Sequence, residues 1–269
     1  MISLQTNVTA LTAGFNLSMN QQAESKAITR LTSGFRINSS GDDAAGLSVA
    51  NKFRSDTAEV SQGVQNANDA LSQLQIIDGG LNDVANLLDR MKTLATESAT
   101  DTFTGDRTIL QGEYATLLTE IDRQAGNVGL DTGGTMAKSL SVYVGGGANP
   151  TVTVDLSGAA VDAAGLGVNG GDISTAAGAV TAIGKIETAI GTLGTAQGAV
   201  GSGENEVSYA VSLGNSQIAG FSAANSRIRD ADIASEAANL SRSQALSQAS
   251  VAALAQANAM PQAVLKLLQ

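Results

Sequence analysis

Two long seven-residue apolar repeats, separated by a Gly-rich stretch of alternating residues, most constrain how this chain can fold. The first consists of Val60, Val64, Ala67, Leu71, Leu74, Leu81, Ala85, Leu88 and Ala95. The second consists of Ile183, Ile186, Ile190, Leu193, Val200, Val207, Val211, Ile218, Phe221 and Ile228. Because an apolar period of 3.5 residues makes a helix bury a narrow stripe against partner helices, the chain is expected to double back so that the two stripes meet.

Helical periodicity extends beyond these two repeats. It predicts helices at about 5–35, 44–98, 106–125, 173–228 and 235–269, with Leu117 and Ile121 on the buried face of the short third helix. Turn-forming residues cluster at 38–43 and 229–232, and these segments are predicted to be connectors. Asp42 or Asp43 is expected to cap the helix that follows it.

The middle of the chain has a different period. Leu140, Val142 and Val144 alternate with polar residues, as do Val152, Val154 and Leu156, and glycines at 145–147 lie between the two runs. This pattern predicts a β-hairpin at about 138–157, followed by a short surface region at about 158–172. The fold class is therefore mainly α: a long antiparallel helical bundle with coiled-coil packing, a small β-hairpin and a terminal two-helix coiled coil.

We expect three segments, at 1–43, 44–228 and 229–269. The first and last combine into the terminal helix pair with its connectors, and the middle segment forms the bundle. The predicted bundle core is Val60, Val64, Leu71, Leu74, Leu81, Leu88, Leu117, Ile121, Ile186, Ile190, Leu193, Val207, Val211, Ile218 and Phe221.

The composition excludes several function classes. A net charge of −10 and the absence of a Lys/Arg cluster argue against nucleic-acid binding. The chain has no cysteine and no histidine, which removes disulfides, thiolate chemistry and the commonest general base and metal ligand. Residues 1–7 lack the features of a cleaved secretory signal, and no run approaches the ~18 apolar residues of a membrane span.

No motif assembles a catalytic, cofactor or metal site. The glycines at 145–147 lack the Lys-Ser/Thr of a phosphate-binding loop. The pairs Asp42/Asp43 and Asp230/Asp232 flank helix starts, where capping accounts for them. An enzyme is not expected.

The terminal helices carry more apolar side chains than one pairing seam would cover. Such exposed stripes mark either docking on the chain's own bundle or burial between copies of the chain. The candidate packing residues between copies are Leu11, Phe15, Leu31, Phe35, Leu246, Leu254, Met260, Val264, Leu265 and Leu268.

Both ends of the chain resemble bacterial flagellins. The segment Arg30–Leu47, with the sequence RLTSGFRINSSGDDAAGL, resembles the family's N-terminal signature. Residues 226–232 and 254–265 resemble its C-terminal signature, and the hairpin at 142–156 is similar to the family's. The resemblance covers about 1–128 and 173–269 and identifies the chain as a short form without large outer domains.

The resemblance implies a subunit of the extracellular flagellar filament, the helical propeller for swimming, which is exported unfolded by a type III apparatus and assembled at the distal tip. The terminal helices would form the inner tube and the long helices the outer tube. The implied partners are further copies of the chain, an export chaperone at the C-terminal helix, and the filament cap and hook–filament junction proteins. Nucleic-acid binding and membrane insertion are not implied.

Vertebrate innate receptors bind some flagellins at positions that match Arg90, Leu94 and Glu113 here. The neighbouring residues, most clearly Thr93, depart from the pattern of strongly recognised members, which argues against receptor activation. Two alternatives to a filament subunit remain open at the level of sequence: a hook–filament junction protein, and a secreted coiled-coil effector or adhesin.

Overall fold

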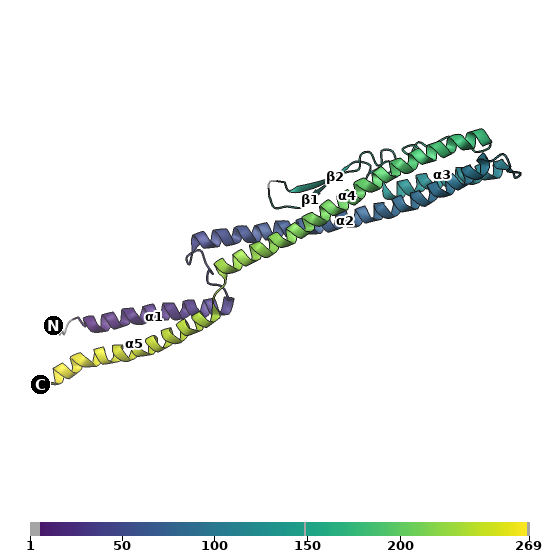
Figure 1. Ribbon diagram of the computed structural model, residues 1–269. Coiled ribbons are helices and arrows are strands. Elements are labelled where there is room, and N and C mark those ends of the chain that lie inside the picture. The colour runs from purple at the N-terminus through teal and green to yellow at the C-terminus, as the bar shows by residue number, and fades with distance from the viewer. Residues whose placement is uncertain (1–5, 148, 268–269) are drawn as a thin grey trace. The chain divides into compact units, whose positions relative to one another are not determined.

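The chain is mainly helical, with one small antiparallel sheet. The computed structural model describes the backbone of residues 6–147 and 149–267 and the side chains of this range up to residue 260. Its elements, shown in Figure 1, are α1 (Val8–Ser33), α2 (Ala44–Ala99), α3 (Arg107–Val128), β1 (Ser139–Tyr143), β2 (Thr151–Asp155), α4 (Ala176–Arg229) and α5 (Ile233–Leu267). Each predicted helix and the predicted hairpin is present within a few residues of its expected bounds, which confirms the predicted fold class.

The chain divides into two compact units. The central unit comprises Thr57–Ala219, and the terminal unit combines Met1–Asp56 with Gly220–Gln269. The divisions fall inside α2 and α4, whereas the sequence suggested boundaries at the connectors. As functional segments, 1–43, 44–228 and 229–269 stay a prediction.

In the central unit, one apolar core joins α2, α3 and α4. Of the predicted core residues, eight are at most 2 % exposed: Val60, Leu74, Leu81, Leu88, Ile121, Ile186, Leu193 and Val207. Val64, Leu71, Leu117, Val211 and Ile218 are half-buried. Phe221 belongs to the terminal unit, where its ring stacks on Phe53 with centroids 5.8 Å apart.

Ile190 does not lie in the core, and its prediction is wrong. It is 36 % exposed, whereas Ala189 beside it is fully buried. The buried face of α4 keeps the seven-residue spacing, but one of its two rows lies one residue before the predicted row of Ile183 and Ile190. This row consists of the small residues Ala182, Ala189, Ala196 and Gly203, all buried. It lies beside a second buried row, which consists of Ile186, Leu193, Val200 and Val207.

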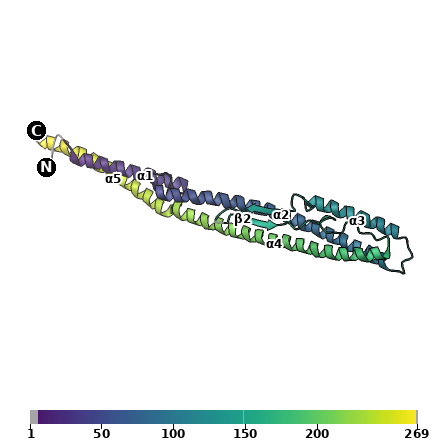
Figure 2. The same ribbon diagram turned by 90° about the horizontal axis from the view of Figure 1, so that it is seen from above.

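The β-hairpin packs on the helices of the central unit, beside α2 and α4 in Figure 2. Its register pairs Ser139 with Asp155 and Tyr143 with Thr151. Two glycines make room for it. A Cβ on Gly63 of α2 would lie 1.9 Å from the carbonyl oxygen of Val144, and one on Gly203 of α4 would lie 2.4 Å from Val154 Cγ1. At Gly63 the two backbones therefore approach more closely than any other residue type allows, and at Gly203 the side chain of Val154 occupies the space of a Cβ.

The segment after the hairpin is more than the surface region that the sequence suggested. Val161 and Val168 are fully buried and Leu166 is 3 % exposed, all within the central core. Backbone bonds hold the segment in place, since Val161 N–H donates to the Leu130 carbonyl (2.9 Å) and Ala163 N–H donates to the Asp122 carboxylate (2.8 Å). These apolar residues show no periodicity among many turn formers, so the pattern alone predicted only a loop.

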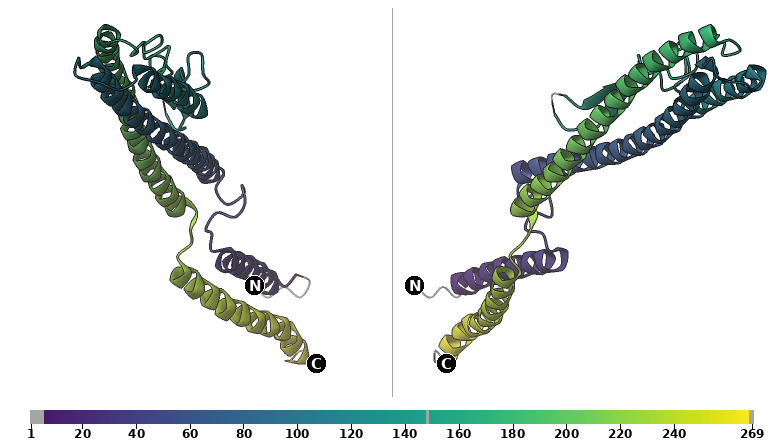
Figure 3. Two further views of the ribbon diagram at one scale, coloured as in Figure 1. Left: turned by 90° about the vertical axis from the view of Figure 1, so that its right-hand side faces the viewer. Right: turned by 45° about the vertical axis from the view of Figure 1, so that its right-hand side comes forward.

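In the terminal unit, α1 and α5 lie side by side and run antiparallel, with both chain ends at the same end of the pair (Figures 1 and 3). Asn7 caps α1 by accepting the Ala10 N–H (3.1 Å), and Gly34 ends the helix in the left-handed region at φ 73°. The two connectors pair through a single antiparallel bridge between Phe35 and Asp230. The terminal unit is therefore held by contacts between residues at opposite ends of the sequence.

Candidate assembly surfaces of the terminal helices

The seam between α1 and α5 consists mainly of small and polar residues. Its buried or half-buried positions recur at alternating intervals of three and four residues, as expected for a coiled coil. On α1 they are Ala10, Ala13, Leu17, Asn20, Glu24, Ala27 and Leu31. On α5 they are Glu236, Leu240, Ser243, Ser247, Ser250, Leu254 and Ala257.

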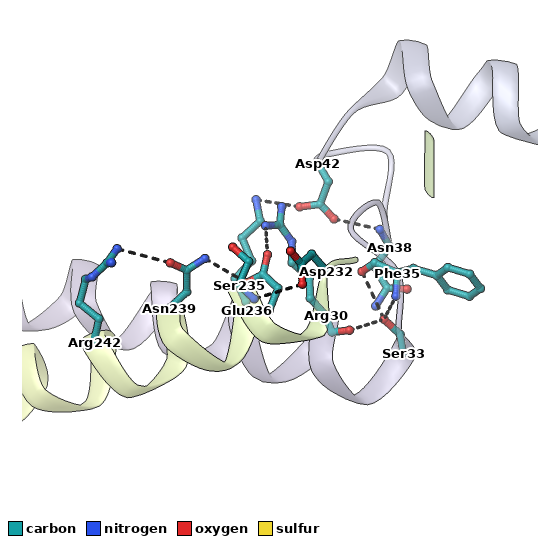
Figure 4. Close-up of polar contacts among 11 residues, drawn as sticks. Arg30, Ser33, Phe35, Asn38, Asp42, Asp232, Ser235, Glu236, Asn239 and Arg242 are labelled. Carbon is teal, nitrogen blue, oxygen red and sulfur yellow. Dashed lines mark hydrogen bonds and ion pairs between the residues drawn. The ribbon is translucent and has the colours of Figure 1, made fainter. Parts of the chain in front are cut away.

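Polar contacts cross this seam at three levels. Asn7 Nδ2 donates to the carbonyl of Ala257 (2.7 Å), and Asn20 Nδ2 donates to Ser250 Oγ (3.0 Å). Nearest the connectors, Arg30 Nη1 donates to Glu236 Oε1 (2.9 Å), and both side chains are mostly shielded from solvent. Figure 4 shows this pair, with Asn239 beside Glu236 and Arg242 bonded in turn to Asn239.

Apart from the leucines of the seam, several large apolar side chains of the pair are exposed. On α1, Leu11 is 72 % and Phe15 is 66 % exposed, and Val8 and Met19 are also exposed. On α5, Leu246 is 48 % and Met260 is 45 % exposed, and Val251 is also exposed. On α1 these residues share one face, whereas on α5 Leu246 and Met260 lie on one side of the seam and Val251 on the other. Each helix thus exposes apolar faces that its partner helix does not cover, the feature expected of a surface that other molecules bury.

The exposed residues agree only in part with the residues that the sequence suggested for packing between copies. Of the predicted residues, Leu11, Phe15, Leu246 and Met260 are exposed, and Leu31, Phe35 and Leu254 are half-buried. Leu268 lies outside the described residues, as do the side chains of Val264 and Leu265. Their role between copies stays a prediction.

In the sequence, apolar residues at spacings of four predict one buried stripe on α1, made of Leu11, Phe15, Met19, Ala23, Ala27, Leu31 and Phe35. This prediction is wrong, because each step of four turns about 40° around a helix with 3.6 residues per turn. The stripe begins on the exposed side at Leu11 and reaches the seam only at Ala27. The sequence also predicts a seam on α5, made of Leu246, Ala249, Ala253, Ala257, Met260, Val264 and Leu267. It is wrong at Leu246, Ala249, Ala253 and Met260, which are exposed, although Ala257 is buried as expected; the side chains of Val264 and Leu267 lie outside the described residues. Polar seam residues carry no hydropathy signal, so sequence reasoning missed them.

The connectors are tied together by backbone and side-chain contacts. Arg36 N–H donates to the Arg229 carbonyl (2.6 Å) and Ala231 N–H to the Gly34 carbonyl (2.9 Å). The Arg229 guanidinium carbon lies 4.2 Å from the centre of the Phe35 ring, a cation–π contact. Phe35 therefore already has a partner within its own unit.

Both predicted capping aspartates accept backbone bonds. Asp43 Oδ1 accepts the Gly46 N–H (2.9 Å) in the first turn of α2. Asp42 Oδ2 instead accepts the N–H groups of Asn38 and Ser39 (3.2 Å each), and its Oδ1 lies 2.8 Å from Lys26 Nζ. The Lys26 ammonium, together with these two N–H groups, holds the pKa of Asp42 well below its ordinary value.

The lowered pKa of Asp42 predicts an acid-sensitive contribution to the terminal unit. A carboxyl whose pKa is depressed by folding stabilises the native state above its unfolded pKa, about 3.9, and loses that contribution as the pH falls further. Asp42→Asn should therefore lower thermal stability at pH 7, and the difference from the unchanged protein should shrink between about pH 4 and pH 2. Circular dichroism melts across pH 2–7 measure this difference. Asp56→Asn, in the same unit, is the charge-matched control, and a difference that stays constant with pH would contradict the prediction.

Of the three positions suggested for receptor contact, two are exposed and one is buried. Arg90 and Glu113 are exposed and form an ion pair across α2 and α3, with Arg90 Nε donating to Glu113 Oε1 (2.9 Å). Leu94 is 1 % exposed and belongs to the central core, so its prediction as a surface contact is wrong.

Neither a metal centre nor a membrane span is found in the described part of the chain. Among the described residues, no three acidic side chains gather in a way that could hold a metal ion. No helix in the same range is both long enough and apolar enough to cross a bilayer.

Comparisons with known proteins agree with the resemblance seen at both chain ends. Residues 4–141 match the model of the bacterial flagellin N-terminal helical region, and residues 183–268 match that of the C-terminal helical region. A flagellin of Halalkalibacterium halodurans is 32 % identical over 267 residues, which is 98 % of each chain. Flagellins of Escherichia coli K12 and Salmonella typhimurium are 38 % identical over 57 % of this chain, and each match spans 31 % of the longer relative. The crystal structure of Bacillus cereus flagellin aligns at 30 % identity with a TM-score of 0.49, covering 56 % of this chain and 88 % of that one.

Proposed function

This chain belongs to the bacterial flagellin family and is a structural subunit of the extracellular flagellar filament, and we propose that its copies polymerise through the outward apolar faces of α1 and α5. In this arrangement the terminal helices form the inner tube of the filament, and the central unit forms the outer tube.

The observation that carries the proposal is the mismatch between the two sides of the terminal pair. The inward seam holds polar residues such as Asn20 and Glu236, several alanines and serines and only four leucines, while Leu11 and Phe15 are about two-thirds exposed or more. Fully burying a Leu or Phe side chain stabilises by about 1.5–3 kcal/mol relative to leaving it exposed. When such faces are buried between successive copies in a polymer, this burial contributes a free energy of association that the isolated chain does not gain.

Further partners belong to the same proposal. An export chaperone would bind the exposed apolar face of α5 before assembly, and the filament cap and hook–filament junction proteins would contact the terminal unit at the two ends of the polymer. We propose no catalytic activity for the chain, because its role rests on repeated surfaces between copies rather than on a reactive cluster.

The test is growth of filaments from purified protein. The protein is dissociated by mild heat, mixed with short filament fragments as seeds and observed by electron microscopy. Long uniform tubes that extend the seeds are expected. Persistent monomers or short stubs would contradict self-assembly and favour a junction protein or a secreted coiled-coil protein.

A further inference from the structure

The polar residues in the α1–α5 seam raise the question of what sets the register of the pair. In an antiparallel pair with an apolar seam, large knobs in complementary holes resist sliding. Here most seam positions are Ala, Ser, Asn or Glu, and a seam of small residues offers few large knobs. The alternative determinants of register are the leucines of the seam, Leu17, Leu31, Leu240 and Leu254, and the backbone bridge between Phe35 and Asp230 in the connectors.

We propose that the ion pair of Arg30 with Glu236, assisted by the bond between Asn20 and Ser250, fixes the register in which α1 pairs with α5 of its own chain. The inference deepens the proposed function, since it names the partner of α1 within the assembling subunit. Arg30 and Glu236 act here as positioning residues, and their effect on assembly is exerted through the placement of the outward faces.

Burial makes this pair selective. The side chain of Arg30 is 23 % exposed and that of Glu236 is 12 % exposed, so both charges are largely removed from water. A slide of one heptad moves one helix along the other by roughly 10 Å, which separates the charges and leaves each of them buried without its partner. An unpaired buried charge is far more costly than a paired one, so sliding is opposed even where the packing of small side chains would permit it.

Register also determines the outward surface. Leu11 and Phe15 on α1 and Leu246 on α5 are fixed to the same helices as the seam residues. A shifted pair would present the same side chains in a different relative order to neighbouring copies. The ion pair thus allows the terminal unit to offer one surface rather than several.

The absence of cysteine allows a direct test by thiol cross-linking. The full-length variant Asn20→Cys/Ser250→Cys places two thiols at a level where the native side chains are bonded at 3.0 Å. The variant Asn20→Cys/Ser243→Cys places the second thiol one heptad away, at another buried seam position. Both are treated with a short thiol-specific cross-linker, as unassembled protein and as seeded filaments, and intramolecular products are separated on denaturing gels.

With Arg30 and Glu236 intact, Asn20→Cys/Ser250→Cys (the in-register pair) should cross-link within one chain at least tenfold faster than Asn20→Cys/Ser243→Cys (the offset pair). This difference is expected in the unassembled protein, in the seeded filaments or in both. Replacing the ion pair by apolar residues, Arg30→Met/Glu236→Leu, should reduce this ratio to about threefold or less. The reversed pair, Arg30→Glu/Glu236→Arg, should restore it.

Three outcomes would overturn the inference. The first is an unchanged ratio in the apolar variant, which would assign register to the leucines or to the connector bridge between Phe35 and Asp230. The second is cross-linking mainly between chains, which would indicate exchange of α5 between copies. The third is no preference for the in-register pair in either sample. Because the ratio can be read from unassembled protein, failure of polymerisation alone would contradict the proposed function and not this inference.

Discussion

Replacing Leu11 and Phe15 together by glutamine is expected to raise the critical concentration for filament growth by about two to four orders of magnitude. Both side chains are exposed in the isolated subunit, so glutamine, a good helix former, should leave the stability of the subunit nearly unchanged. Burial of the two side chains between copies would contribute roughly 3–6 kcal/mol per subunit, and each 1.4 kcal/mol corresponds to a factor of ten in an equilibrium constant. Sedimentation of seeded polymer at a series of protein concentrations measures the effect.

The matched control is Ile109→Gln on α3 of the central unit. Ile109 is 71 % exposed, nearly the same as Leu11, but it lies outside the terminal helices. Its substitution should change the critical concentration less than about threefold, because an apolar surface residue outside the assembly contact contributes little. Equal loss in both variants would show that the apolar faces of the terminal helices are not the main contact between copies.

Substitution of Gly63 by alanine should lower the free energy of unfolding of the central unit by about 1–3 kcal/mol. The added Cβ would lie 1.9 Å from a carbonyl oxygen of the hairpin, so β1 or α2 must shift as a whole. Overpacking against backbone has this magnitude, and it exceeds the gain of about 1 kcal/mol that alanine brings over glycine within a helix. Urea denaturation of the full-length protein, followed by circular dichroism, measures the change.

Gly79→Ala separates the steric effect from helix propensity. Gly79 lies in the same helix and the same unit, is exposed, and has no atom within 4 Å of the position its Cβ would take. This variant should be more stable than the unchanged protein, by up to about 1 kcal/mol. Should Gly63→Ala stabilise the protein as Gly79→Ala does, the close approach of α2 and the hairpin would be refuted.

The helices and the hairpin could be predicted because each has a clear signal in the sequence. Apolar repeats of 3.5–3.6 residues mark α2 and α4, strict alternation marks β1 and β2, and Gly or Asp clusters mark their ends. Asp106 illustrates the last signal, since it caps α3 by accepting the Thr108 N–H (2.8 Å). The buried residues of α2 could also be predicted from the apolar repeat, because large side chains such as Leu74 and Leu81 occupy these positions.

The candidate assembly surface could be predicted only in part. The sequence indicates that α1 and α5 carry excess apolar side chains, but it does not reveal which face pairs within the chain. Arg30, Glu236 and Asn20 resemble solvent-facing residues until the opposite helix is placed beside them. In the same way, Ile190 was preferred to Ala189 for the core because hydropathy favours the larger side chain, whereas close helix packing selects the smaller one.

The antiparallel pairing of α1 with α5 also dictates an order of folding. Its polar contacts join residues 206, 230 and 250 positions apart, among the longest loop closures this chain can make. Contacts of such high sequence separation form slowly unless intervening structure shortens the loop. The central unit does this, since Gly214 of α4 lies against Val60 and Val64 of α2. We therefore expect the terminal pair to form after the central unit. A chain that lacks either end, or whose central unit has not folded, would not present a completed terminal pair to a growing filament.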